Sequence, residues 1–427
     1  MRKSFLHLIP ALIASTGILA LIGCGSGSVV SGTSAYTVSG TVAGLAAGES
    51  VSVQDNGQDT LALSANGAFS FPVNMDTGAA YAITVQSHTP GIACSVANGS
   101  GTVGSSNVTG IGISCAAGTQ SVLYSFGATA TDGLNPGAAQ LTVNAGNFYG
   151  TTEKGGENGY GAVYKITAAG TESVLYSFGA TASDGAGPVG GLIVDSAGNL
   201  YGTTVQGGAK HHGTVFKISA AGTESLLYSF GATASDGWAP LTSLIMDSAG
   251  NLYGTTTSGG ANDHGTVFKI GAAGTESVLY SFGATASDGQ QPYAGLLADS
   301  AGNLYGTTYI GGANNRGTVF KISAAGTESL LYSFGATASD GVGPYADLIT
   351  DSAGNLYGTT EQGGANDKGT VFKISAAGTE SVLYSFGATG TDGATPYASL
   401  IVDSAGNLYG TTYGGGANGN GTVFKID

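Results

Sequence analysis

A 52-residue repeat occupies most of this 427-residue chain and constrains its fold more than any other feature. The motif Leu-Tyr-Ser-Phe-Gly recurs at that interval, with its tyrosine at Tyr124, Tyr176, Tyr228, Tyr280, Tyr332 and Tyr384. The motif Gly-x-Val-x-Lys-Ile follows the same spacing, with its lysine at Lys165, Lys217, Lys269, Lys321, Lys373 and Lys425. A fixed period of this kind indicates a repeat architecture, in which each unit buries its apolar surface against its neighbours.

Each unit contains four strand-like runs separated by glycine-rich turns. In the third unit these runs cover residues 244–247, 251–256, 265–270 and 276–282. None of them has a helical period. Four short antiparallel strands in a unit of this length predict a propeller blade, so the expected fold is all-β, with a six-bladed β-propeller over residues 118–427. A β-helix is the alternative, although its coils are usually much shorter.

The two ends of the repeat array have the sequences of adjacent strands of one blade. The array begins at residues 121–126 with the sequence of a fourth strand and stops at residues 422–426 with that of a third strand. We therefore expect the first segment to complete the last blade, because closing the ring removes the open sheet edges. A solenoid would instead need distinct polar caps.

Composition restricts the class of partner. Only 9% of the residues are charged, and the net charge is −15. An acidic chain is repelled by phosphates, so we expect no nucleic-acid partner. With 21 tyrosines, 15 phenylalanines and no collagen period among its 76 glycines, the chain is neither disordered nor collagen-like. It contains no P-loop or dinucleotide fingerprint, and we predict no cofactor.

Residues 1–23 have the pattern of an export signal, in which two basic residues precede an uncharged apolar run. The run ends in Leu-Ile-Gly-Cys and is followed by a Gly/Ser tether, residues 24–34. This sequence resembles the lipobox of bacterial lipoproteins, which implies that Cys24 carries lipid. Gly25, in place of Asp, implies the outer membrane or the cell surface. A plain signal peptide or a membrane-spanning helix is the alternative.

Residues 35–117 predict a small antiparallel β-sandwich that serves as a spacer. Short runs alternate with period two, and Asn-Gly turns separate them. Once Cys24 is assigned to lipid, Cys94 and Cys115 remain as an even pair, and we expect a disulfide between them in an exported chain. A two-cysteine metal site is the alternative, for which His88 is the candidate third ligand.

Variation among the repeats is confined to one predicted face. In a blade, the first-to-second and third-to-fourth turns lie on one face, and the second-to-third loop and the link between blades lie on the other. The turns of the first face, D-S-A-G and S-A-A-G, hardly vary. We call the other set the variable loops; they are residues 153–160, 205–212, 257–264, 309–316, 361–368 and 413–420, and the links that contain Leu134, Ala186, Trp238, Gln290, Val342 and Ala394.

The variable loops gather aromatic and polar side chains, a mixture that suits binding of a glycan or a protein partner. The candidate ligand-binding residues are Tyr160, His211, His212, Trp238, His264, Tyr309, Arg316 and Tyr413. Neutral drift in a recently duplicated repeat is the alternative explanation of the variation.

Other chemistry has weaker support in the sequence. Histidines in neighbouring loops (His211, His212 and His264) could meet a metal, but solvated loop histidines are more common and we predict no metal site. No catalytic motif is present, so we predict a protein that is not an enzyme. A propeller hydrolase or lyase acting on polysaccharide is the alternative, as is a purely structural envelope protein. The acid pair of such an enzyme would come from Glu153, Glu157, Asp263, Glu361 or Asp367.

Two structural roles are also predicted. The aspartate that begins each D-S-A-G turn should cap its own turn, as Asp does in many tight turns. Lys217 and Glu224 stand seven residues apart around the third-to-fourth turn, and we expect them to face one another as a cross-strand pair.

The motifs L-Y-S-F-G, D-S-A-G-N-L-Y-G-T-T and G-G-A-x-x-x-G-T-V-F-K-I resemble the Gloeo-Verruco tandem repeat of bacterial surface proteins that carry different anchors. The resemblance covers residues 119–427. The first unit departs from it, with Val143-Asn144-Ala145-Gly146 in place of Asp-Ser-Ala-Gly. It implies a surface protein and implies no activity.

Overall fold

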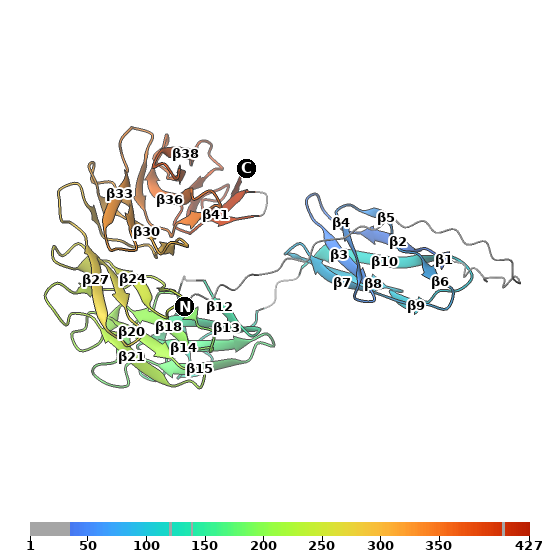
Figure 1. Cartoon of the computed structure of the whole chain (residues 1–427), viewed down its shortest axis with the longest axis horizontal. Helices are drawn as coiled ribbons and strands as arrows, with labels where there is room; N and C mark the ends of the chain where they lie inside the picture. Colours follow the sequence, from blue (N-terminus) through green and yellow to red (C-terminus); the bar gives the residue numbers. More distant parts are fainter. Residues whose placement is uncertain (1–34, 119–121, 138–139, 404–405) are drawn as a thin grey trace, which may run out of the picture. The chain divides into compact units, whose positions relative to one another are not determined.

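The computed structural model describes residues 35–118, 122–137, 140–403 and 406–427. The expected export signal, Cys24 and the tether lie outside the described residues. The chain divides into two compact units with a boundary between Ser121 and Val122 (Figure 1). Both units are built from strands, and no helix occurs in the described ranges. None of the described segments is therefore a helix of the length and apolarity that a membrane span requires.

The first unit contains ten strands. They are β1 (Ala35–Tyr36), β2 (Val38–Ala43), β3 (Val51–Asp55), β4 (Asp59–Leu63), β5 (Gly67–Ser70), β6 (Met75–Asp76), β7 (Ala80–His88), β8 (Ile92–Ala97), β9 (Ser100–Thr102) and β10 (Val108–Ala117). Two four-stranded sheets, in the orders β5-β2-β10-β8 and β4-β3-β7-β9, share one apolar core that includes Val38, Val53 and Ile113. The expectation of a wholly antiparallel unit is wrong in one place, because β2 and β10 pair in parallel.

The disulfide prediction is confirmed. Cys94 of β8 and Cys115 of β10 lie directly opposite one another in the antiparallel ladder, with their Cα atoms 4.1 Å apart, and their sulfurs are bonded. The bond links the two strands at one edge of the sheet and joins residues 21 positions apart in the chain.

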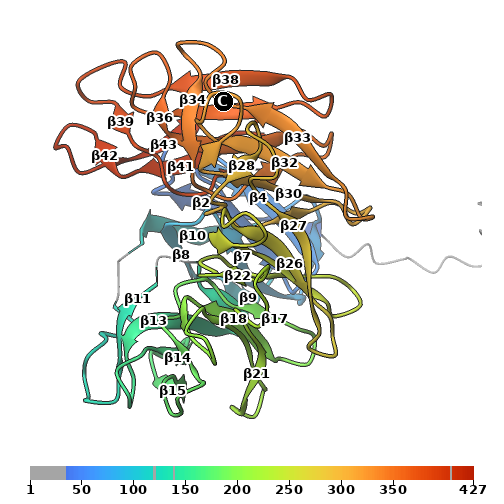
Figure 2. The same cartoon turned by 90° about the vertical axis from the view of Figure 1, so that its left-hand side faces the viewer.

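In the second unit, each repeat forms one main antiparallel sheet, and these sheets succeed one another in chain order (Figures 1 and 2). In four of the six repeats a separate two-stranded sheet accompanies the main one. The first two repeats contain β11 (Gly133–Pro136), β12 (Thr142–Asn144), β13 (Asn147–Gly155), β14 (Ala162–Thr167) and β15 (Glu172–Ser177), then β16 (Gly185–Ala186), β17 (Ile193–Val194), β18 (Leu200–Thr204), β19 (Gln206–Gly207), β20 (Thr214–Ile218) and β21 (Glu224–Ser229). The next two contain β22 (Gly237–Trp238), β23 (Ile245–Met246), β24 (Leu252–Thr256), β25 (Ser258–Gly259), β26 (Thr266–Ile270) and β27 (Glu276–Ser281), then β28 (Gly289–Gln290), β29 (Leu297–Ala298), β30 (Leu304–Thr308), β31 (Ile310–Gly311), β32 (Thr318–Ile322) and β33 (Glu328–Ser333). The last two contain β34 (Gly341–Pro344), β35 (Ile349–Thr350), β36 (Leu356–Gly363), β37 (Thr370–Ile374) and β38 (Glu380–Ser385), then β39 (Gly393–Ala394), β40 (Ile401–Val402), β41 (Leu408–Thr412), β42 (Gly414–Gly415) and β43 (Thr422–Ile426).

The apolar core of this unit lies between successive sheets. At each junction the phenylalanine of L-Y-S-F-G packs edge-on against the phenylalanine of the next G-T-V-F-K-I strand; the rings of Phe230 and Phe268, for example, are 5.0 Å apart and both side chains are fully buried. Gly254 makes room for this ring, because a Cβ there would lie 2.7 Å from Phe268. Each sheet therefore depends on its neighbour, as expected for a repeat protein.

The last sheet lacks its fourth strand. β43 pairs with β41 on one side, and no described segment pairs with its other edge. Val423 is consequently 81% exposed, whereas its equivalents in the five preceding sheets are fully buried. The expected pairing is therefore not seen for residues 122–126, the described part of the first segment. Instead, Phe126 packs against Tyr164 of the first sheet, with ring centroids 4.8 Å apart, just as the later phenylalanines pack on the sheet that follows them.

The predicted turn caps are confirmed. Asp195 Oδ1 accepts hydrogen bonds from the backbone N–H groups of Ala197 and Asn199, and its Oδ2 accepts from the Asn199 side chain and the Tyr201 hydroxyl at 2.7 and 3.0 Å. The same pattern recurs at Asp247, Asp299 and Asp351. These aspartates hold the nearly invariant turns of the first face.

Candidate functional site

The variable loops are joined by backbone hydrogen bonds into one continuous rim. In each link, the residue after the Trp238 position adopts a left-handed conformation; it is Asn135, Gly187, Ala239, Gln291, Gly343 or Thr395, with φ between 56° and 66°. Ala239 N–H donates to the carbonyl of His212 in the preceding loop at 3.0 Å, and its own carbonyl accepts from Thr257 N–H at 3.3 Å. Left-handed conformations are unfavourable for residues such as Ala and Thr. These paired hydrogen bonds hold them in place and fix the position of each loop relative to the next.

A second repeated position presents a long side chain on this rim. The residue directly before the G-T-V-F-K-I glycine lies against the glycine that ends L-Y-S-F-G; we call these the pre-glycine residues, and they include Tyr160, His212, His264, Arg316 and Lys368. His212 lies over Gly231, which has φ of +85°, so any Cβ at Gly231 would collide with the imidazole. The glycine that ends L-Y-S-F-G therefore leaves the space that the variable pre-glycine side chain occupies.

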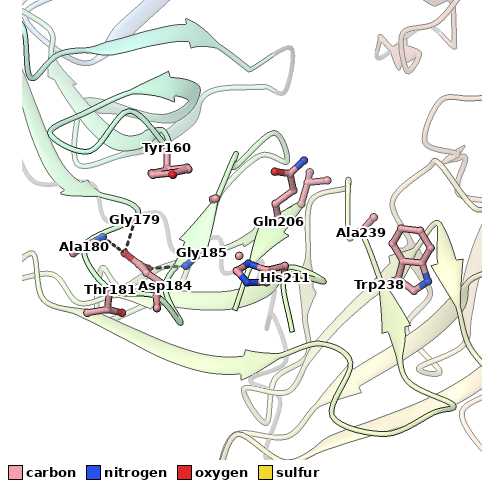
Figure 3. A pocket seen from close by; sticks show the side chains of 14 residues that line it. Tyr160, Gly179, Ala180, Thr181, Asp184, Gly185, Gln206, His211, Trp238 and Ala239 are labelled. Atoms are coloured by element: carbon pink, nitrogen blue, oxygen red, sulfur yellow. Dashed lines mark hydrogen bonds between the residues drawn. The ribbon is translucent and has the colours of Figure 1, made fainter. Parts of the chain in front are cut away.

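Trp238 lines two hollows. The larger, of about 640 Å³, is lined by Tyr160, Asp184, Gln206, His211 and Trp238, among other residues. Figure 3 shows Tyr160 and Trp238 toward opposite ends of this hollow, with His211 and Gln206 between them. The smaller, of about 470 Å³, is lined by Trp238 together with His212, Asp236 and Asp263.

The indole ring is held in position while part of it stays accessible. Its centroid is 5.7 Å from that of the His212 imidazole, the two planes being tilted by 32°, and its Nε1–H donates to Asp263 Oδ1 at 3.3 Å. The side chain is nevertheless 40% exposed. An aromatic ring that is fixed in orientation but open to solvent loses little conformational entropy when a ligand stacks on it.

The predicted site residues separate into three groups. Tyr160, His211, His212 and Trp238 surround the two hollows. His264 and Arg316 occupy pre-glycine positions and line neither hollow. Tyr309 and Tyr413 belong to a second cluster, built with residues that the sequence analysis did not select as binding residues: Tyr293, Tyr345, Tyr397 and Glu361.

The three histidines do not converge. His211 lines the larger hollow, His212 stacks on Trp238, and His264 lies over Gly283. Within the described ranges, no group of three or more His, Cys, Asp and Glu side chains is arranged to hold a metal ion.

Three of the five acids considered for hydrolysis have structural hydrogen bonds. Asp263 and Asp367 accept from the backbone N–H groups of Gly259 and Gly363 within their own loops, both at 3.1 Å. Glu361 accepts hydrogen bonds from the hydroxyl groups of Tyr309 and Tyr397. These hydrogen bonds give each of the three carboxylates a structural role within the variable loops.

The expected Lys–Glu pairs are wrong. The strand register places Lys217 opposite Ser225 and Glu224 opposite Ile218. A shift of one residue sends the two side chains to opposite faces of the sheet. Lys217 Nζ instead lies 5.5 Å from the ring centroid of Tyr201, a cation–π contact.

The glutamates lie instead near a Tyr–Asp pair of the preceding repeat. Tyr176 donates its hydroxyl proton to Asp184 at 2.9 Å, and Glu224 lies near this pair. Burial, and then the charge of Asp184, raise the pKa of Glu224 from 4.5 to about 7. Glu276, Glu328 and Glu380 have the same surroundings and the same raised pKa of about 7.

The 52-residue period and its antiparallel sheets define the class of the chain as a tandem-repeat β protein. The sequence profile of the Gloeobacter/Verrucomicrobia repeat family matches residues 79–298 and 284–427, which is more than half of the chain. The protein belongs to that family. The match begins inside the first unit, earlier than the resemblance seen in the repeat motifs alone. No curated protein sequence matches the chain.

Solved structures match the chain at low sequence identity. A structure described as a gluconolactonase is 13% identical, with a TM-score of 0.35, over 62% of this chain and 83% of that one. A 6-phosphogluconolactonase-like protein from Bacteroides uniformis is 17% identical, with a TM-score of 0.41, over 65% and 80%. A puromycin hydrolase is 12% identical, with a TM-score of 0.46, over 70% of this chain and 46% of that one.

Proposed function

We propose that this protein is an exported, lipid-anchored envelope protein that binds a glycan through its variable loops. The observation that carries the proposal is the setting of Trp238. It is the one tryptophan of the chain, its ring is held by His212 and Asp263, and its partly exposed side chain lines two hollows. Fixed, open aromatic rings beside hydrogen-bonding groups are suited to recognising the apolar faces and hydroxyl groups of sugars.

A glycan array of soluble residues 25–427 tests this proposal. The variant Trp238→Ala should lose the bound signal. The variant Gln290→Ala changes the equivalent position of the next repeat and should retain the signal, so it controls for general damage to the links. A signal that survives Trp238→Ala would show that Trp238 is not part of the site, and the absence of any signal for the wild type would refute glycan binding.

The anchor and the location are part of the same proposal. The lipobox-like Leu-Ile-Gly-Cys sequence supports attachment through Cys24, and the bonded pair of Cys94 and Cys115 is consistent with an oxidising compartment. Replacing Cys24 by Ser should release the protein from the membrane fraction. Unchanged fractionation of this variant would refute the lipid anchor.

We also propose that the first unit is a β-sandwich and that the repeats close into a six-bladed propeller. The unpaired edge of β43 has the same sequence, Thr-Val-Phe-Lys-Ile, as four of the five inner third strands, each of which is paired with an L-Y-S strand. By that register, Val423 would lie opposite Tyr124. A disulfide formed within the monomer between Val423→Cys and Tyr124→Cys would support closure. Cross-linked dimers alone, or no cross-link, would contradict it.

A further inference from the structure

A row of tyrosines runs across the variable loops of the last three repeats. Tyr293 and Tyr345 stack with ring centroids 5.3 Å apart and planes at 16°. Tyr345 contacts Tyr397 edge-on at 5.4 Å, and Tyr397 contacts Tyr413 at 5.8 Å. Tyr309 stands edge-on to both members of the stacked pair, at 5.5 and 6.2 Å. We call these five residues the tyrosine row; their loops lie in the gold-to-red part of the chain in Figure 2.

The fold does not require this row. Tyr293, Tyr345 and Tyr397 each follow the proline of a link, and the same position in the first three repeats is Gly137, Val189 or Leu241. Those repeats build the same antiparallel sheets without an aromatic ring there. Stability of the repeat therefore does not explain why three successive repeats carry tyrosine at one place.

One carboxylate, that of Glu361, holds two of the five tyrosines by hydrogen bonds. Glu361 Oε2 accepts a hydrogen bond from the Tyr309 hydroxyl at 2.6 Å, and Glu361 Oε1 accepts one from the Tyr397 hydroxyl at 2.9 Å. The hydrogen bond to Glu361 raises the pKa of Tyr309 to about 12, and burial together with the same carboxylate raises the pKa of Tyr397 to about 12. Both phenols therefore remain protonated donors at any physiological pH. Two rings from different repeats are thus oriented by a single carboxylate.

The row also remains accessible. Tyr345 and Tyr397 are 38% and 37% exposed, and Tyr413 is 77% exposed. A contiguous exposed aromatic surface on a protein indicates an interaction site. Aromatic faces bind the apolar faces of sugar rings, and the phenol groups can bond to the sugar hydroxyls. The central charge is a carboxylate and the chain has a net charge of −15, so an acidic glycan would be repelled.

We infer that the tyrosine row is the binding surface for an extended neutral polysaccharide chain, with successive rings contacting successive sugar residues. This inference rests on the proposed function and names its substrate class. It is distinct from the Trp238 hollows, which lie in the first three repeats. Because four of the rings contact one another in succession, affinity should rise with the length of the glycan.

Isothermal titration of soluble residues 25–427 with neutral di-, tetra- and hexasaccharides of β-glucan, xylan and mannan tests the inference. We expect the hexasaccharide of one of these series to bind at least tenfold more tightly than its disaccharide. Tyr345→Ala and Tyr397→Ala should each weaken hexasaccharide binding about tenfold. Tyr345→Phe keeps the ring and should remain within threefold of the wild type. Leu241→Ala changes the equivalent position of the third repeat and should also remain within threefold.

The other outcomes overturn one proposal or both. Binding that is lost in Trp238→Ala but unchanged in Tyr345→Ala would refute the tyrosine row while the proposed function stands. Binding lost in Tyr345→Ala alone would support the row and remove Trp238 from the site. No binding of any oligosaccharide would refute both. Tetramethylammonium chloride is titrated in parallel as a test for recognition of organic cations. Binding of this cation without binding of the sugars, abolished by Glu361→Gln, would show that the row recognises organic cations and that the glycan assignment is wrong.

Discussion

The half-buried glutamates between the repeats predict that alkaline conditions destabilise the second unit. Glu224, Glu276, Glu328 and Glu380 have a pKa raised from 4.5 to about 7, first by burial and then by an aspartate of the preceding repeat. A carboxyl group whose pKa is higher in the folded state contributes stability that is complete below pH 4.5. That contribution is lost as the pH rises through about 7.

The magnitude follows from the change in pKa. A rise from 4.5 to about 7 corresponds to about 3 kcal/mol for one fully buried group. These side chains are only half-buried and are screened by solvent, so we expect about 1 kcal/mol each, or about 4 kcal/mol for the four together. For a unit of this size, that energy lowers the Tm by roughly 6 °C between about pH 5 and about pH 8.5.

Thermal unfolding at constant ionic strength, followed by far-ultraviolet circular dichroism, measures this effect. Glu276→Gln cannot ionise and should raise stability by about 1 kcal/mol at about pH 8.5 while leaving it unchanged at about pH 5. Glu153→Gln, in an exposed position of a variable loop, is the matched control and should change neither value. A Tm that is constant or rises over the same pH range would refute the reasoning. Loss of stability in more acidic solution has a different origin, because the Asn355 side chain lowers the pKa of Asp351 to about 2.

Three further predictions concern stability. Thr395→Gly should stabilise the second unit by about 0.5–1 kcal/mol in thermal unfolding, because Thr395 has φ of 58° and glycine adopts that conformation without strain; a lower Tm would contradict the strain assigned to the links. Phe268→Ala should cost about 3–5 kcal/mol in urea unfolding, because the ring is fully buried between two sheets, and a loss under about 1 kcal/mol would show that the junction is not close-packed. Replacing Cys94 and Cys115 together by Ala should destabilise the first unit by about 3 kcal/mol in guanidinium, and an unchanged midpoint would mean that the disulfide adds nothing to stability.

The repeat period predicted the strands and turns of the second unit well. Position along a fixed 52-residue unit located each strand, and the D-S-A-G aspartates cap their turns as expected. The Lys217–Glu224 pair failed because spacing around a turn does not set the register. Ile218 pairs with Glu224, whereas pairing of Lys217 with Glu224 would place Ile218 opposite Thr223, so the observed turn is one residue longer than the expected pair would need. The parallel pairing of β2 with β10 joins segments far apart in the chain, which local patterns cannot specify.

The candidate site was predicted in part. Comparison of the repeats selected Trp238, His212, Tyr309 and Tyr413, because they vary among otherwise uniform units. It could not show that Glu361 accepts hydrogen bonds from tyrosines 52 and 36 residues away, since this depends on how neighbouring sheets are placed in space. A signal was nevertheless present in the sequence: tyrosine follows the link proline in the last three repeats only.

Hydrogen exchange measured by mass spectrometry, with and without a bound neutral hexasaccharide, tests most directly whether the variable loops are a ligand-binding face. We predict slower exchange in residues 205–212 and 236–240 around Trp238, and in residues 309–316, 341–345, 361–368 and 393–397 around the tyrosine row. The D-S-A-G turns of the opposite face should exchange at the same rate in both states. Protection confined to those turns, or to residues 35–117, would contradict the account.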